Sequence, residues 1–231
     1  MLDELQHMFV RIILHLPVST PKPILTFDTG LLSMRHRVMA AKLNLAYYLR
    51  FCGESNLAGQ VNAEQLRWGW PGLSQEVTAI SKQLGIRDVN DMAANEMSSV
   101  MWKNIVNKAV WMDYELYLRN KMGGKLEDIK SDSFGRKDYL SNKSIENSRM
   151  MIRIRSKMVH VKDNFKNMHK NKTNGLACES CNKVQNETQA HVLMCPAYNK
   201  LREGLTLSNQ DDLIKYFREV MMARDKLGSK K

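Results

Sequence analysis

The sequence CESCNKVQNETQAHVLMC, residues 178–195, holds three of the chain's four cysteines and one histidine. Read as ligands, these residues have the spacing C-x2-C-x9-H-x3-C. A C-x2-C turn directs two thiolates at one point, and H-x3-C places an imidazole and a thiolate on one face of a helical turn. Four such donors complete a tetrahedron and leave no position for water or substrate, so the spacing predicts one structural zinc ion. The predicted ligands are Cys178, Cys181, His191 and Cys195.

Other interpretations of this cluster stay open. A C-x-x-C redox pair normally opens a helix in a strand–helix setting, which the flanking sequence does not indicate. A chance grouping of reduced, unliganded thiols is the other alternative. Residues 175–205 have few apolar side chains, so we expect the metal to be their main organiser. The fourth cysteine, Cys52, ends a predicted helical stripe and is expected to be a small core residue.

The composition is that of a folded protein from a reducing compartment. Hydrophobic residues make up 43% and charged residues 26% of the 231 residues, so the chain can bury a sizeable core. Clustered cysteines argue against a disulfide framework. No apolar run approaches the length of a membrane span, and residues 1–16 carry charges that favour an amphipathic helix over a signal peptide. We therefore expect an intracellular protein, nuclear or nucleo-cytoplasmic, without a membrane partner.

The net charge of +11 is concentrated in one segment. Residues 143–172 hold nine Lys and Arg against two Asp and Glu, a net charge of +7, whereas residues 1–142 and 173–231 each have a net charge of +2. Such a segment indicates a polyanion partner, RNA or DNA, and a solvated helix face is the alternative. Aromatic residues are sparse there, which favours backbone contacts over base stacking. The predicted phosphate contacts are Arg149, Arg153, Arg155, Lys157, Lys162, Lys166, Lys170 and Lys172.

Apolar residues at three- and four-residue spacing predict a mostly α protein. The expected architecture is a helical bundle, followed by a small zinc-stapled module and a C-terminal helix. The predicted boundaries are a helical region over 1–140, a basic helical segment with the zinc finger over 141–205, and an amphipathic helix with a frayed tail over 206–231.

Two long helices, over about residues 30–51 and 92–122, are each predicted to bury one apolar stripe. The stripe of the first consists of Met34, Val38, Ala41, Leu45, Tyr48 and Cys52. The stripe of the second consists of Met101, Ile105, Ala109, Met112 and Leu116. A shorter helix between them is expected to present Leu73, Val77, Ile80 and Leu84 on one face. The tryptophans are expected to pack in the core.

Several stretches occur in a suggestive order: RMMIRIRSKM from Arg149, VKDNFK from Val161, the C-x2-C pair, and ETQAHVLMCP from Glu187. This order resembles the zinc-binding region near the C-terminus of reverse transcriptases from non-LTR retrotransposons. LPVSTPKPIL from Leu16 and GLLSMRHR from Gly30 resemble the helical region after the polymerase domain of such elements. The resemblance implies that the finger contacts template RNA or target DNA, with other retroelement proteins as further partners.

The sequence predicts no enzymatic activity. A polymerase needs paired aspartates in a strand–turn context, and the only adjacent pair, Asp211 and Asp212, begins a polar helix. No Gly-rich phosphate loop and no nucleophile motif are present, and the 36 residues after Cys195 are too few for an endonuclease. The leading hypothesis is a zinc-stabilised nucleic-acid-binding module. A zinc-stapled interaction or scaffold domain and a decayed retroelement fragment without function are the alternatives.

Overall fold

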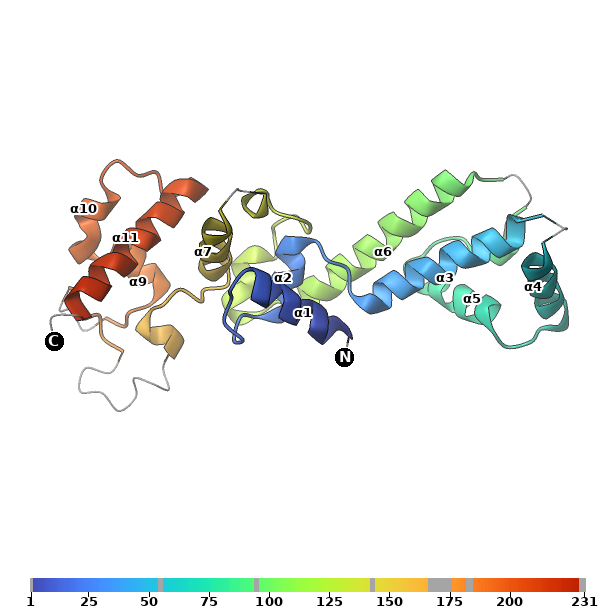
Figure 1. The fold of residues 1–231 in the computed structure, drawn as a ribbon, viewed down its shortest axis with the longest axis horizontal. Helices are drawn as coiled ribbons and strands as arrows, with labels where there is room; N and C mark the ends of the chain where they lie inside the picture. The colour runs from blue at the N-terminus through green and yellow to red at the C-terminus, as the bar shows by residue number, and fades with distance from the viewer. Residues whose placement is uncertain are drawn as a thin grey trace. The chain divides into compact units, whose positions relative to one another are not determined.

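The computed structural model describes residues 2–53, 56–93, 96–141, 144–165, 176–181 and 185–228. These residues form helices joined by turns, and within them there is one isolated antiparallel bridge and no strand (Figure 1). The mostly helical fold with a Cys/His cluster in its C-terminal part is thereby confirmed. The α-helices are α1 (Leu2–Ile13), α2 (Lys22–Thr29), α3 (Met34–Phe51), α4 (Leu57–Trp68), α5 (Leu73–Leu84), α6 (Ser99–Lys121), α7 (Ile145–Arg155), α9 (Gln189–Met194), α10 (Asn199–Arg202) and α11 (Gln210–Gly228). No helix of these ranges is long and apolar enough to cross a membrane.

The chain forms two compact units, and their boundaries differ from the predicted ones. Unit 1 consists of Met1–Asp3 and Leu31–Lys121, and unit 2 of Glu4–Gly30 and Met122–Lys231. The segment with α1 and α2 therefore belongs with the C-terminal part of the chain. Hydrogen bonds from the backbone N–H groups of residues 135 and 137 to the carbonyls of residues 27 and 28 attach α2 to that part, at 3.1 and 2.9 Å. Sequence periodicity carries no information on such long-range pairing.

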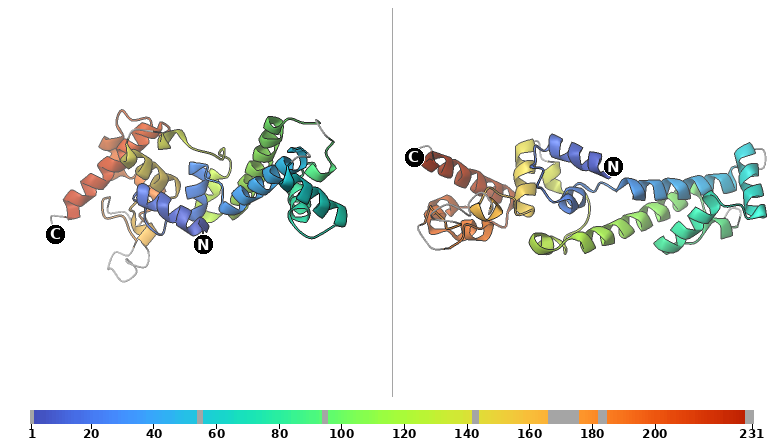
Figure 2. Two further views of the ribbon diagram at one scale, coloured as in Figure 1. Left: turned by 45° about the vertical axis from the view of Figure 1, so that its right-hand side comes forward. Right: turned by 90° about the horizontal axis from the view of Figure 1, so that it is seen from below.

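Unit 1 is built on two long helices. Helices α3 and α6 lie side by side and run in opposite directions (Figures 1 and 2). At the centre of their core, Trp102 is buried and its indole N–H donates to the Leu43 carbonyl at 3.3 Å. The predicted face of α5 is confirmed, because Val77 is part of this core and Leu73, Ile80 and Leu84 pack against it.

On both long helices the structure buries a different face from the predicted one, although Met34, Ile105 and Ala109 of the predicted stripes are partly buried. Val38, Leu45 and Tyr48 of α3 are 48%, 48% and 55% exposed, and Met101, Met112 and Leu116 of α6 are 57%, 58% and 60% exposed. The buried positions are His36, Met39, Leu43 and Ala46 on α3 and Trp102, Val106, Val110, Tyr114 and Leu118 on α6. Each helix carries apolar residues on two faces, so periodicity alone does not choose between them. Packing selects the face that buries large rings such as the indole of Trp102.

Two smaller expectations are corrected as well. Trp68 and Trp70 are 63% and 59% exposed, so core packing holds for Trp102 and is wrong for these two. Cys52 is only half-buried at the C-terminal cap of α3, where its thiol lies 3.6 Å from the Leu49 carbonyl. It is not a core residue.

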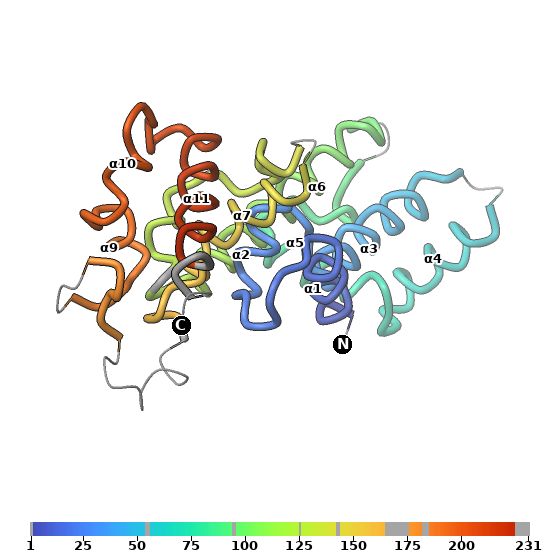
Figure 3. Tube along the Cα trace, turned by 60° about the vertical axis from the view of Figure 1, so that its left-hand side comes forward, coloured from blue at the N-terminus to red at the C-terminus, as the bar shows by residue number. Residues whose placement is uncertain are grey.

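Unit 2 contains α1, α2, α7 and the helices around the Cys/His cluster. Helix α11 lies against α7 and α10 (Figure 3). Its buried side chains include Tyr216, Phe217 and Val220, so the amphipathic C-terminal helix packs into this unit. The predicted basic helix is shorter than expected, because α7 ends at Arg155 and a 3₁₀ turn follows at Lys162–Phe165.

Candidate metal centre

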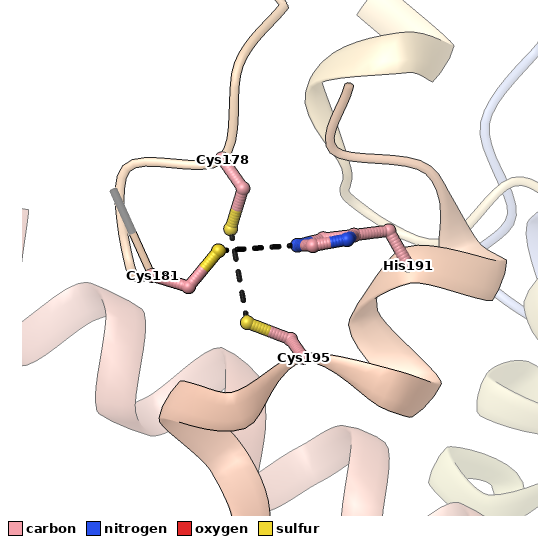
Figure 4. Close-up of side chains that lie close together, drawn as sticks. All are labelled: Cys178, Cys181, His191 and Cys195. Carbon is pink, nitrogen blue, oxygen red and sulfur yellow. Dashed lines mark hydrogen bonds between the residues drawn. The ribbon is translucent and has the colours of Figure 1, made fainter. Parts of the chain in front are cut away.

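The four predicted ligands converge on one point (Figure 4). Their donor atoms all lie within 4.8 Å of one another. The Cys178 and Cys195 sulfurs are 3.9 Å apart, and the Cys181 sulfur lies 3.4 Å from His191 Nε2. In a tetrahedral zinc site with Zn–S bonds of about 2.3 Å and Zn–N bonds of about 2.0 Å, these separations would be about 3.8 and 3.5 Å. The cluster can therefore hold a metal ion, and its geometry is compatible with zinc.

Local structure explains why the ligands meet. The bridge between Ala177 and Asn186, with a bond from Cys178 N–H to the carbonyl of residue 185 at 3.0 Å, brings the Cys-x2-Cys turn back toward α9. Thr188 caps α9, and its side chain accepts a hydrogen bond from the His191 N–H at 3.0 Å. Cys195 follows the last residue of α9, so His191 and Cys195 are separated by about one helical turn.

The histidine is oriented by a neighbour. His191 Nδ1 lies 3.1 Å from the Gln185 side-chain oxygen. An amide oxygen only accepts, so this contact places the ring proton on Nδ1 and leaves the Nε2 lone pair facing Cys181. Metal-ligating histidines generally use such a partner to set their tautomer and orientation.

Replacement of Gln185 by Ala is expected to lower the zinc affinity about tenfold, because the ring loses this orienting bond. A competitive titration with a coloured chelator measures the change. Gln210→Ala, which removes an exposed glutamine at the start of α11, serves as the control. Equal affinities of the two variants would show that Gln185 does not orient the ligand.

The burial and the spacing of the thiols suit a bound cation and not a disulfide. Cys178 and Cys195 are buried, and their 3.9 Å separation is far from the S–S bond length of about 2.05 Å. Burial raises the pKa of the Cys195 thiol to about 12, so a thiolate there requires a bound cation to stabilise it. Cys178 and Cys181 lie in a turn and do not open a helix, which argues against the redox interpretation.

Charged residues next to the Cys/His cluster attach it to the rest of unit 2. Buried Glu187 accepts a hydrogen bond from the Lys162 backbone N–H at 3.3 Å and forms an ion pair with Arg224 of α11. The ammonium group of Lys162 donates to the Ala177 carbonyl at 2.8 Å and pairs with Glu179 at 2.7 Å. Lys162, a predicted phosphate contact, is thus a buried residue that supports the Cys178 segment.

A second predicted contact, Arg155, is also an internal residue. Its guanidinium pairs with Asp28 at 2.7 and 3.0 Å and with Asp132 at 2.7 Å. Asp28 also accepts the Tyr139 hydroxyl at 2.5 Å. Burial lowers the pKa of Arg155, but the two carboxylates more than reverse this and hold it above its ordinary value. Burial and the charge of Asp28 raise the pKa of Tyr139, so this hydroxyl remains a donor.

The remaining predicted contacts divide into three groups. Lys157 forms an exposed ion pair with Asp128 at 2.6 Å. Arg149 and Arg153 lie one turn apart on α7, and Arg149 donates to the Leu14 carbonyl at 3.1 Å. Lys166, Lys170 and Lys172 lie outside the described residues.

Unit 1 contains a polar cluster that sequence reasoning missed. Ser33 Oγ lies 2.6 Å from His36 Nδ1, and His36 Nε2 lies 3.0 Å from Asp113 Oδ2. The connection resembles a catalytic Ser–His–Asp chain, but Ser33 is buried and its hydroxyl caps α3. Through the bond between His36 and Asp113, this cluster joins the start of α3 to α6.

The resemblance to non-LTR reverse transcriptases rests on the order of the sequence motifs. Comparisons of the chain with protein-family models, with curated proteins and with solved structures found no match. Function therefore has to be inferred from the metal-ligand cluster and the charges around it.

Proposed function

We propose that unit 2 binds one structural zinc ion and is a non-catalytic module that binds the backbone of RNA or DNA. One observation carries this proposal: Arg149 and Arg153 are neighbouring cations, and among the described residues neither is paired with a carboxylate. Burial and the charge of Arg149 lower the pKa of Arg153, and the Arg153 Nε atom is buried without a hydrogen-bond partner. A phosphate group beside the two guanidinium groups would offset the repulsion between them.

The sequence beside the Cys/His cluster supports the same proposal. Residues 166–172, KNMHKNK, contain three lysines and no acidic residue. They connect the 3₁₀ turn after α7 to the first ligand, Cys178. We propose that Lys166, Lys170 and Lys172 add phosphate contacts to those of Arg149 and Arg153, while Arg155 and Lys162 act inside the fold.

Zinc has a structural role in this proposal. Three thiolates and one imidazole fill a tetrahedron, so no coordination position is left for a reacting group. The motif order that resembles the C-terminal region of non-LTR reverse transcriptases supports a related origin. It also supports template RNA or target DNA as ligands.

The second candidate function is a zinc-stapled scaffold that binds protein. It is favoured by the ion pairs of three cations of the basic segment, Arg155, Lys157 and Lys162. Carboxylates within the fold neutralise the charges of these three residues. A scaffold of this kind would not bind a polyanion with a steep salt dependence.

Replacement of Arg149 and Arg153 by Gln is expected to reduce the slope of log K against log salt by about 1.8 for duplex DNA, because each lost phosphate contact contributes about 0.9. Anisotropy of labelled RNA and duplex DNA across a salt series measures the slope. Lys103→Gln/Lys108→Gln removes the same charge from exposed positions of α6 and is the matched control. We expect its slope to equal that of the unchanged protein.

Zinc content, measured alongside, shows whether each variant keeps its metal. Equal losses in both double variants would assign the binding to net charge and contradict the proposed site. No binding by the zinc-loaded protein at low salt would favour the scaffold.

A further inference from the structure

The outer face of α3, formed by Met34, Val38, Ala41, Leu45 and Tyr48, is an apolar seam. Its members alternate by four and three residues, an average of 3.5, which is the spacing that keeps one helix in register with another. Val38, Leu45 and Tyr48 are about half exposed, although the opposite face of the same helix is filled by the core of unit 1. A second seam on a helix that already has a buried face is suited to a further helix.

Cations border this seam on both sides. Arg35 and Lys42 flank it on one side and Arg37 on the other, and α3 contains no acidic residue. Lys42 is paired with Glu76 of α5 at 2.5 Å. In the described structure, Arg35 and Arg37 are exposed and have no carboxylate partner, and Arg37 donates only to the Leu32 carbonyl at 3.3 Å.

A groove lies beside the N-terminal half of the seam. It has a volume of about 380 Å³ and lies between α3 and α5. Met34, Val38 and Ile80 supply its apolar lining, and Arg35, Lys42 and Gln83 supply polar groups. An apolar side chain from a docked helix can enter this groove while acidic neighbours reach the arginines.

We propose that the outer face of α3 is the docking surface for an amphipathic helix of a partner protein, with large apolar residues at its seam positions and Glu or Asp beside them. The apolar seam anchors the partner, and Arg35 and Arg37 select for its acidic flanks. This surface belongs to unit 1 and does not depend on the nucleic-acid function of unit 2.

The charges favour an acidic partner over two other occupants. In a second copy, the cations beside one α3 would meet the cations beside the other, which opposes pairing through this face. Nucleic acid would satisfy the arginines but would leave the apolar seam in contact with polar phosphates and sugars.

The probe is a labelled helical peptide of about three heptads, with Leu at seam positions and Glu at flanking positions. A second peptide has Lys in place of each Glu. Anisotropy with the full zinc-loaded chain measures both affinities. We expect the Glu peptide to bind and the Lys peptide to bind at least about tenfold more weakly.

Variants test the location of binding. Leu45→Glu is expected to weaken binding of the Glu peptide about tenfold or more, because it places a charge in the middle of the seam. Leu116→Glu is the matched control: it makes the same substitution at an exposed position of α6, where Leu116 is 60% exposed compared with 48% for Leu45. Arg35→Glu/Arg37→Glu is expected to reverse the preference in favour of the Lys peptide. Circular dichroism and zinc content confirm that each variant is folded.

Several results would overturn the proposal. Equal binding of the two peptides would remove the charge selection, and equal effects of the two Leu→Glu variants would remove the assignment to α3. A dimer in sedimentation analysis that Leu45→Glu converts to monomer would assign the face to a second copy. Displacement of the bound peptide by RNA would assign the face to nucleic acid, and absence of peptide binding would exclude a docking surface of this chemistry.

Discussion

Removal of the metal is expected to unfold the segment from Leu176 to Arg202 and to leave unit 1 folded. The four ligands come from a turn and from the two ends of a short helix. Besides the cysteines, Val192 and Tyr198 are the buried apolar side chains among the described residues of this segment. Structural zinc contributes on the order of 10 kcal/mol in small modules, which is comparable with the whole stability of a typical domain. The core of unit 1 draws on none of these residues.

Hydrogen exchange of individual segments, with and without a chelator, measures this unfolding. Cys195→Ala should reproduce the effect of the chelator, because it removes one buried ligand. Cys52→Ala makes the same change at a half-buried position outside the cluster and should retain full protection of residues 176–202. Unchanged protection of this segment in the chelated protein would mean that apolar packing alone organises it.

The packing of α11 sets how far the unfolding should spread. The Tyr216 hydroxyl donates to the Val192 carbonyl at 2.5 Å, and Arg202 donates to the Leu193 carbonyl at 3.0 Å. The first bond joins α11 directly to α9, and the second joins α10 to α9. Exchange should therefore also accelerate at the buried face of α11 once α9 loses its metal-bound ends. The helices α2 and α7 are held by a separate polar network and should change less.

Replacement of Arg155 by Met is expected to destabilise unit 2 by about 3–5 kcal/mol, the usual cost of leaving a buried charge without its partner. The Asp28 side chain is fully buried, and the Arg155 side chain is 16% exposed. Without the guanidinium, Asp28 would keep one hydroxyl donor, Tyr139. Urea unfolding of the zinc-loaded protein, followed by a probe confined to unit 2, measures the loss.

A matched control lies two residues away. Lys157→Met also removes a cation from an ion pair, but the side chains of Lys157 and Asp128 are 38% and 73% exposed, so the expected cost is below about 1 kcal/mol. The double variant Asp28→Leu/Arg155→Met should recover much of the loss, because it also removes the fully buried carboxylate, and the other partner of Arg155, Asp132, is 37% exposed. If Arg155→Met and Lys157→Met had equal effects, Arg155 would not be a structural residue of this kind.

The four residues that the structure brings together as possible metal ligands were all predicted from the sequence. Its ligands lie within eighteen residues, and the chemistry of thiolate and imidazole donors restricts their spacing. The helical class and the core face of α5 were also predicted, because α5 has one apolar face and Gly85 ends it in a left-handed conformation. The orienting role of Gln185 was missed, since nothing in the sequence distinguishes it from any other polar residue of the loop.

The sequence by itself determined the features whose interactions are local: the helical class, the core face of α5 and the closely spaced ligands. The tertiary structure alone decided which face of α3 and α6 is buried, since both helices carry two apolar faces and only their mutual packing selects one. It also decided that α2 joins α7, through Asp28 and Arg155, which are 127 residues apart. An arginine in a buried ion pair and a solvated arginine cannot be distinguished in the sequence. Only the tertiary structure, which places Asp28 beside Arg155, distinguishes them.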